Sequence, residues 1–124
     1  MTAEEFRELA LSLEDAIEGA HMGHPDFRAN GRIFATLHAG DKTGMVKLLP
    51  EEQQEFLRGH RQMFEPSPGA WGRQGCTTVI LKSADKRTIR SAMNLAWQHV
   101  MTMPPPKKRA AKAGKAAKTT RRQR

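Results

Sequence analysis

The last 21 residues of the chain restrict most strongly what it can fold into. Residues 104–124 open with three consecutive prolines and contain no acidic side chain. Their nine basic residues, separated mainly by Ala, Gly and Thr, are Lys107, Lys108, Arg109, Lys112, Lys115, Lys118, Arg121, Arg122 and Arg124. A segment of this composition buries no core, so we expect a disordered cationic tail. The folded domain is therefore predicted to lie within residues 1–103.

The charge of the chain is divided unevenly between these two parts. The whole chain has 21 Lys and Arg against 13 Asp and Glu, a net charge of +8. Without the tail, 12 basic residues remain against the same 13 acidic ones. A flexible run of cations binds polyanions by releasing counterions and does not read sequence. We therefore expect the tail to bind nucleic acid, DNA before RNA; the alternatives are a solubilising tail or a chance resemblance to a nuclear-import signal.

The length and the cysteine count limit the class of protein. Residues 1–103 are enough for one domain with a single hydrophobic core. Cys76 is the only cysteine, which excludes an internal disulfide and is typical of a reducing compartment. No apolar run approaches the ~18 residues of a membrane span, and the N-terminus lacks the order of a signal peptide. The sequence thus predicts a cytoplasmic protein, with association to the nucleoid a further option.

The first half of the domain is predicted to form a helix and then three antiparallel strands. Thr2 and Glu5 have the spacing of a capping box, and apolar side chains follow at helical intervals as far as Ile17. Asn30-Gly31 is typical of a type I′ turn, because both of its central residues need positive φ. This turn joins strands at 27–29 and 32–37, and a second turn leads to a strand at 45–49.

The strand predicted at 32–37 has two distinct faces. Side chains alternate from one face of a strand to the other. The pattern places Ile33, Ala35 and Leu37 on one face, with Phe34 and Thr36 on the opposite face.

The second half is predicted to contain two helices and one buried strand. Pro50 begins a helix that ends near Gly59, since proline at the first helical position loses no useful N–H. Its expected buried residues are Phe56 and Leu57. A proline- and glycine-rich loop then surrounds Trp71.

The last elements complete an α+β fold. The β-branched run at 77–82 predicts a buried strand. A final helix begins near Ser83 or Asp85 and ends at the proline run. The fold class is a small α+β domain with an antiparallel sheet and flanking helices.

Three stretches together form a recognisable combination. They are Gly23-His24-Pro25-x-Phe27 followed by Gly31-Arg32-Ile33-Phe34-Ala35, then Lys47-Leu48-x-Pro50-Glu51-Glu52, and finally Trp71-Gly72 leading into Val79-Ile80-Leu81. Over about residues 2–103, the chain resembles the MmcQ/YjbR-like family of small bacterial proteins. The resemblance implies a double-wing, DNA-binding-like arrangement without an established catalytic activity. Residues 24–49 would supply the wing hairpins.

Five basic residues of the domain are candidate contacts to nucleic acid. Arg28 and Arg32 flank the tip of the first predicted hairpin, and Lys42 lies in the next turn, where a wing would meet phosphates. Lys47 and Arg73 complete the set. The alternative for each residue is an ordinary solvated side chain. Clustering on one face of the domain would distinguish the two.

Four residues, His21, His24, Asp26 and His38, raise the question of a metal site. The His-x-x-His spacing suits a helix. Here it falls in a turn that enters a strand, where we expect the two rings to diverge. We therefore predict no metal and no cofactor.

Cys76 raises the question of an enzyme. A nucleophilic cysteine needs an adjacent base, and a nearby histidine could provide it. No glycine-rich nucleophile elbow surrounds Cys76, and a cysteine entering an apolar strand is typically a small packed residue. We therefore predict no catalytic residue. An enzyme that uses His21, His24 and Cys76 stays as an alternative, which a pocket gathering these side chains would favour.

Two further alternatives concern binding partners. Trp71, Phe27 and Phe34 could stack on bases, although we expect Trp71 to cover the core. Nine of the 13 acidic residues lie within 4–18 and 51–55. The acidic faces of the helices in these two segments could instead bind a protein partner. The protein would then be an adaptor, and the tail would be incidental to its function.

Overall fold

The computed structural model describes residues 1–104, and the predicted tail beyond them lies outside the described residues. The chain has an α+β fold. Its elements in order are α1 (Ala3–Leu11), β1 (Ile17–His21), β2 (His24–Ala29), β3 (Arg32–Leu37), β4 (Thr43–Lys47), α2 (Pro50–Gly59), β5 (Phe64–Pro66), α3 (Gly69–Arg73), β6 (Cys76–Ile80), the short 3₁₀ turn η1 (Leu81–Ser83) and α4 (Lys86–Thr102). The predicted fold class is confirmed.

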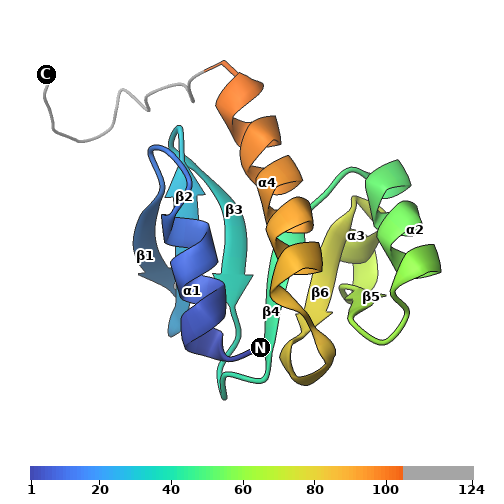
Figure 1. Ribbon diagram of the computed structural model, residues 1–124. Coiled ribbons are helices and arrows are strands. Elements are labelled where there is room, and N and C mark those ends of the chain that lie inside the picture. The colour runs from blue at the N-terminus through green and yellow to red at the C-terminus, as the bar shows by residue number, and fades with distance from the viewer. Residues whose placement is uncertain (105–124) are drawn as a thin grey trace, which may run out of the picture.

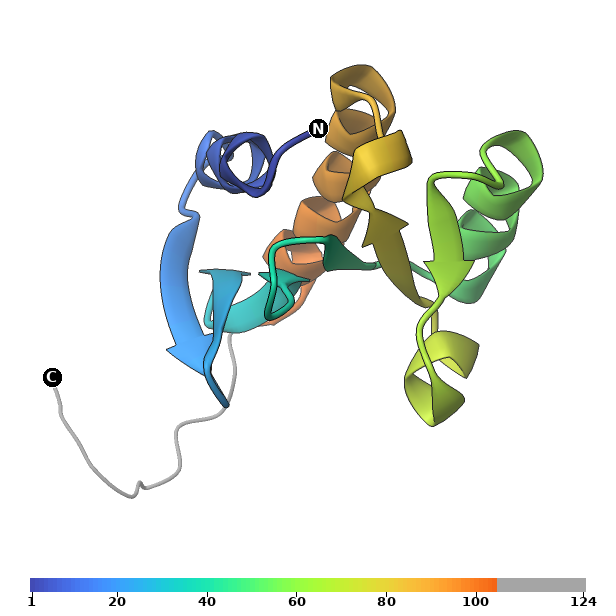
Figure 2. The same cartoon turned by 90° about the horizontal axis from the view of Figure 1, so that it is seen from below.

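The six strands form one antiparallel sheet in the order β1-β2-β3-β4-β6-β5. Helices α1 and α4 lie side by side on one face, against β3 and β4 (Figure 1). Viewed at right angles, α3 lies on the opposite side of the sheet from α1 and α4 (Figure 2). One face of the sheet is therefore closed by helices, and the other is largely open.

The hydrophobic core fills the space between the sheet and the helices α1 and α4. Helix α4 begins after the N-cap Asp85, whose side chain accepts a hydrogen bond from Thr88 N. It turns one apolar stripe inward, made of Ile89, Ala92, Met93, Ala96 and Val100. The strands and α1 contribute Phe6, Phe27, Phe34, Leu37, Val46 and Val79. This burial of apolar surface is the main stabilisation of the fold.

Predictions that rest on local cap and turn chemistry are confirmed. The capping box between Thr2 and Glu5 is present at the start of α1. Asn30 and Gly31 have φ values of 53° and 73°, as the predicted hairpin turn requires. Helix α2 begins at Pro50. Each of these features depends on residues that are close together in the chain.

The predicted first helix is too long. Helix α1 ends at Leu11, and Asp15 has a φ of 69°, in the left-handed region. Ile17, expected on the helix, begins strand β1 opposite Arg28 and is 62% exposed. As an edge strand, β1 pairs with backbone N–H and C=O groups of β2 that would otherwise be unpaired. These hydrogen bonds stabilise the strand more than the helical spacing of the apolar residues stabilises a longer helix.

The prediction of two faces for β3 is wrong at Phe34. A β-bulge shifts the register, so that Phe27 lies opposite Ala35 but Arg28 lies opposite Ile33. A bulge inserts one extra residue into a strand and changes which face the following residues occupy. Phe34 is consequently in the core with Ala35, and Ile33 is half-buried on the open face.

The structure differs from prediction in three more places. The strands β4 and β6 begin earlier than the predicted 45–49 and 77–82. The predicted loop around Trp71 contains β5 and α3. In α2 the buried residue is Gln53, while Phe56 and Leu57 are only partly buried. Gln53 is inside because its amide bonds to the backbone of the α3–β6 turn.

Within residues 1–104, no helix combines the length and the apolar composition that crossing a membrane requires.

Candidate nucleic-acid interface

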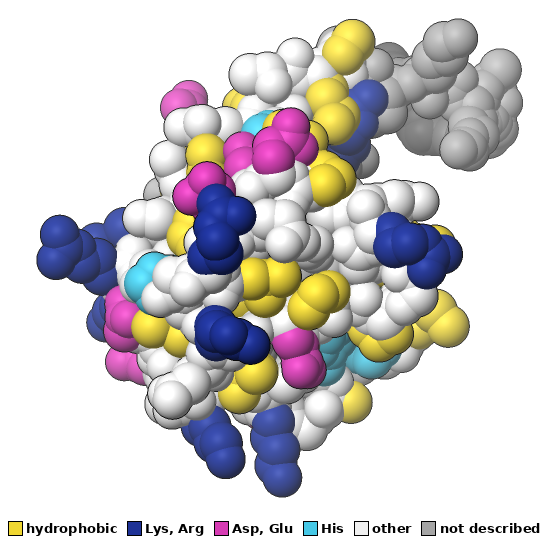
Figure 3. All heavy atoms as spheres, turned by 90° about the vertical axis from the view of Figure 1, so that its right-hand side faces the viewer, with side chains coloured by type: hydrophobic (Ala, Val, Ile, Leu, Met, Phe, Trp, Pro, Cys, Tyr) yellow, Lys and Arg dark blue, Asp and Glu magenta, His cyan; other side chains and the backbone are white. Residues whose placement is uncertain are grey.

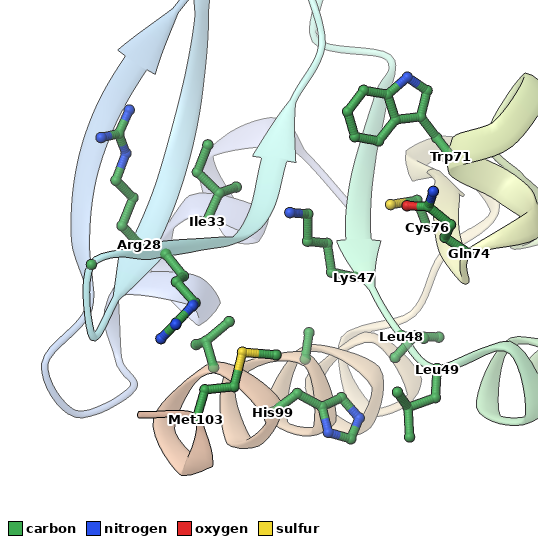
Figure 4. Close-up of a pocket in the computed structure, with 14 residues that line it drawn as sticks. Arg28, Ile33, Lys47, Leu48, Leu49, Trp71, Gln74, Cys76, His99 and Met103 are labelled. Atoms are coloured by element: carbon green, nitrogen blue, oxygen red, sulfur yellow. The ribbon is translucent and has the colours of Figure 1, made fainter. Parts of the chain in front are cut away.

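A groove opens where two neighbouring strands separate. Strands β3 and β4 pair from Leu37 opposite Gly44 to Ala35 opposite Val46. Beyond this point Lys47 extends from β4 into the space between the strands (Figure 4). The resulting cavity has a volume of about 650 Å³. We call it the basic groove, and its characteristic lining residues are Arg28, Arg32, Lys47, Trp71, His99 and Met103.

Arg28 joins the groove to a buried carboxylate. Its Nε and Nη2 atoms donate hydrogen bonds to Asp26 at 2.7 and 3.0 Å, and Asp26 is fully buried. His21 Nδ1 lies 2.7 Å from the same carboxylate. The hydrogen bond from Arg28, and then the one from His21, hold the pKa of Asp26 below its ordinary value against the effect of burial. Arg28 therefore neutralises a buried charge before it can attract a ligand.

Arg32 and Lys47, unlike Arg28, do not neutralise a carboxylate. Within the described part of the chain, neither lies within 4 Å of a carboxylate oxygen. Arg32 Nη1 instead donates a 2.6 Å hydrogen bond to the carbonyl of Pro104. Both cations are thus free to meet an anion in the groove, and one of them touches the point where the predicted tail begins.

The far end of the groove is held by hydrogen bonds to α4. Asn30 Nδ2 donates to the carbonyls of Val100 at 2.8 Å and Met103 at 3.0 Å. These bonds satisfy carbonyls that the end of a helix leaves unpaired. The β2–β3 turn therefore fixes the position of the C-terminus of α4.

Helix α3 forms the opposite wall and presents Trp71. The residue is 64% exposed, so the expectation that it covers the core is wrong. Gly72 packs so closely on Ser67 that a Cβ atom would overlap the Ser67 carbonyl. The buried amide of Gln53 donates to the carbonyls of Gly72 and Cys76, both at 3.0 Å. These contacts fix α3 in a position that holds the indole at the surface.

The structure brings together only part of the predicted basic set. Arg28, Arg32 and Lys47 line the basic groove. Lys42 precedes β4 while Lys47 ends it, so the two lie at opposite ends of that strand. Arg73 is on α3 but does not line the groove. The nine basic residues of the tail lie outside the described residues.

Sequence reasoning missed the residues that α4 contributes. His99 lines the groove, and its Nε2 lies 2.7 Å from Glu52 Oε1. Glu52 also accepts a hydrogen bond from Leu49 N at the start of α2. His99 follows Ala96 by three residues, so helical periodicity alone places it beside the apolar stripe. Nothing in the sequence shows that this edge of α4 adjoins a cavity.

A second cavity, of about 260 Å³, lies on the other side of Trp71. We call it the histidine pocket, and its lining residues include His21, His24, His38, Trp71, Cys76 and Thr78. His21 and His24 are partners across β1 and β2, with ring centroids 6.0 Å apart. The predicted turn is present at Met22 and Gly23. The expectation that the two rings diverge is wrong, because the turn joins antiparallel strands and places the histidines opposite each other.

The chemistry of the histidine pocket does not favour a nucleophile. Burial raises the pKa of the Cys76 thiol, and nearby Lys47 offsets this only in part. A reactive cysteine needs a lowered pKa. Burial, and then the charge of His24, lower the pKa of His38, whose Nδ1 bonds to Thr43 Oγ1 at 2.8 Å. The pocket does gather His21, His24 and Cys76, as the enzyme alternative requires, while burial raises the pKa of its thiol.

The histidines also bear on the question of a metal. No group of three or more histidine, cysteine or carboxylate side chains in residues 1–104 is arranged to hold a metal ion. His24 Nδ1 is buried and has no hydrogen-bond partner in this part of the chain. The pocket is thus lined by imidazoles together with apolar side chains such as Met45 and Trp71, and one buried ring nitrogen of His24 has no partner in the described chain.

The similarity to known proteins now decides the family. The model of the YjbR family matches residues 11–99. The chain belongs to the YjbR family. The resemblance noted in the sequence is confirmed. No curated protein matches the chain.

Two solved structures share this YjbR fold. A protein of Deinococcus radiodurans, DR2400, described as a DUF419 domain, is similar over 82% of this chain and 79% of its own, with a TM-score of 0.70 and 16% identity. A protein from Pseudomonas syringae is similar over 81% of this chain and 99% of its own, with a TM-score of 0.66 and 18% identity. At these identities the similarity establishes the fold.

Proposed function

We propose that this YjbR-family protein is a non-enzymatic nucleic-acid-binding protein, with DNA as the first choice. The cationic tail supplies affinity without reading sequence, and the basic groove orients the polymer on the domain. Such a role places the protein in the cytoplasm, in association with the nucleoid. The observation that carries the proposal is the bond from Arg32 to the carbonyl of Pro104, because it joins the groove to the start of the tail.

The charges of the groove and the tail reinforce one another. Arg32 and Lys47 lack carboxylate partners in residues 1–104, and the nine tail cations follow Pro104 between residues 107 and 124. Closely spaced cations release several counterions from one polyanion. On the face shown in Figure 3, basic, acidic and hydrophobic side chains are intermixed. Among the described residues, this face therefore offers no continuous basic patch beside the groove, and in our proposal most of the affinity comes from the tail.

The adaptor alternative receives less support from the fold. Two of the acidic side chains that motivate it, Glu4 and Glu18, both pair with Arg7 at 2.8 and 3.0 Å. A third, Glu5, accepts a hydrogen bond from Thr2 N. These carboxylates stabilise the start of the domain, so fewer are available to a protein partner.

A salt titration tests the role of the tail. The full chain and a 1–104 truncation are each titrated against a labelled DNA duplex at several NaCl concentrations. We expect the full chain to show a slope of log K against log salt of about −5 to −8, at ~0.9 per phosphate contact. The truncation should bind more weakly, with a slope of about −2 from Arg32 and Lys47. Equal and salt-insensitive binding by both chains would refute the proposal.

A matched pair of double variants tests the groove. Arg32→Ala with Lys47→Ala removes two charges from the groove, and Lys82→Ala with Arg87→Ala removes two exposed charges near the opposite end of α4. In the full chain at low salt, we expect the groove pair to weaken binding by about tenfold and the control pair by less than about twofold. Equal losses would show that total charge alone matters.

A further inference from the structure

We propose that the groove and the histidine pocket together bind single-stranded nucleic acid, with one base stacked on Trp71 and inserted into the histidine pocket. This inference rests on the proposed function and specifies its substrate. The sugar-phosphate backbone of the strand lies along the basic groove.

The first observation is that the two cavities meet. Trp71 and Cys76 line both of them. Lys47 and Cys76 are partners across β4 and β6, and the next pair on the same face, Met45 and Thr78, lines the histidine pocket. Successive same-face pairs are about 7 Å apart along a strand, a length that one extended nucleotide covers. A phosphate held by Lys47 thus places its base at the pocket.

The second observation is the exposure of Trp71. A tryptophan is normally among the most buried side chains, yet 64% of this one is accessible. Figure 4 shows its ring standing beside β4, on the same side of the groove as Cys76. An exposed indole next to a cationic groove is the arrangement on which unpaired bases stack, because every base offers a π-face.

The third observation is the size and chemistry of the histidine pocket. Its volume of about 260 Å³ is enough for about nine water molecules at about 30 Å³ each. A nucleobase has a similar number of non-hydrogen atoms, so one base fits the pocket. Imidazole rings stack on bases. His24 lines the pocket, and its Nδ1 is buried and without a partner in the described chain. A rotation of this ring on binding would let Nδ1 pair with the polar edge of a base. Thr78 adds a hydroxyl at the lining.

The geometry selects single strands over duplexes. In a duplex each base is stacked and paired, and it reaches a protein pocket only by being extruded at a cost of a few kcal/mol. A single strand avoids this cost. The tail, in contrast, contacts phosphates of either form. Preference for single strands therefore reports on the pocket and on Trp71, and not on the tail.

Affinity measurements with substitutions at Trp71 test the inference. The full chain is titrated with the 15-nucleotide oligomer dT15 and with a 15-base-pair duplex at 200 mM NaCl. We expect tighter binding of dT15, a loss of about tenfold for dT15 in Trp71→Ala and less than about twofold for the duplex. Trp71→Phe keeps an aromatic face and should retain most of the affinity. Circular dichroism verifies that both variants are folded.

Fluorescence gives an independent measurement in a protein with Trp71 intact. Trp97→Phe leaves Trp71 as the only indole, because the chain has two tryptophans. We expect dT15 to quench its emission, whereas heparin, a polyanion without bases, leaves it unchanged.

The outcomes separate this inference from the proposed function. Unchanged dT15 affinity in Trp71→Ala, with no quenching by dT15, overturns the inference, while salt-dependent binding through the tail would still support the proposed function. Absence of binding to either nucleic acid overturns both. Weaker dT15 binding by Trp71→Ala, together with quenching of Trp71 by dT15 but not by heparin, supports both the inference and the proposed function.

Discussion

The two faces of the central sheet are built from the same strands but have opposite character. The face under α1 and α4 is apolar, with Phe27, Phe34 and Val79 fully buried. The other face carries Lys47 and His24, and among residues 1–104 only the short helix α3 stands against it (Figure 2). Because side chains alternate along a strand, the strands β2, β3, β4 and β6 each supply the core and the candidate site at once. The closed face stabilises the fold, which leaves the open face free to carry charge.

The largest expected effect contrasts two adjacent residues that the bulge places on opposite faces. Phe34→Ala should lower the free energy of unfolding by about 4 kcal/mol, because it leaves a cavity in the core. Ile33→Ala, on the open face, should cost about 1 kcal/mol. Urea denaturation of both variants gives the two values. Similar losses would contradict the different environments of the two side chains.

The next effect concerns Asp26, a carboxylate buried on the open face. Asp26→Asn should cost about 3 kcal/mol at pH 7, since it leaves Arg28 without its charged partner. Arg28, and then His21, hold the pKa of Asp26 low in the folded state. The stabilisation that ionised Asp26 gives the fold is therefore complete above about pH 4, near the pKa of Asp in the unfolded chain. It is lost as the pH falls through the lower pKa of Asp26 in the folded state.

The measurement is urea denaturation between pH 7 and pH 2. The difference in unfolding free energy between wild type and Asp26→Asn should narrow at the acid end. The matched control is Asp41→Asn, which changes the same charge at an exposed turn and should have little effect. A difference for Asp26→Asn that does not depend on pH would mean that packing, and not charge, is responsible.

A smaller effect is expected in the reactivity of the single thiol. Cys76 lines both cavities but is buried, and burial raises its pKa. Alkylation by iodoacetamide at neutral pH should be about tenfold slower in the native protein than in urea, and it should accelerate as the pH rises. Mass spectrometry measures the modified fraction. Equally fast labelling in both states would show that the open face is loosely packed or that the thiol is activated.

The smallest effect on folding is expected at the tryptophan of the open face. Trp71→Ala should change the free energy of unfolding by less than about 0.5 kcal/mol, because most of the ring is in solvent. Trp97 is the matched control, since its Nε1 donates a 2.8 Å hydrogen bond to the Glu14 carbonyl and the ring packs against the core. Trp97→Ala should cost about 3 kcal/mol. A large loss at Trp71 would assign it a structural role.

The candidate site was only partly predictable. Arg28 and Arg32 were predicted as contacts because they flank a turn, and they do line one cavity, together with Lys47 of the following strand. Lys42 was predicted for its place in the next turn, and it lies at the other end of β4. A turn residue is recognised from its neighbours, but membership of a groove depends on how far two strands separate and on which helix stands opposite.

The sequence by itself determined the features that depend on neighbouring residues: the cap of α1, the Asn30-Gly31 turn, the start of α2 and the α+β class. It also determined that the cationic excess lies after residue 103. Only the tertiary structure decided the strand β1, the bulge that turns Phe34 inward, and the meeting of two cavities at Trp71. The physical reason is range: caps and turns involve a few consecutive residues, whereas strand register and cavities follow from packing among segments far apart in the chain.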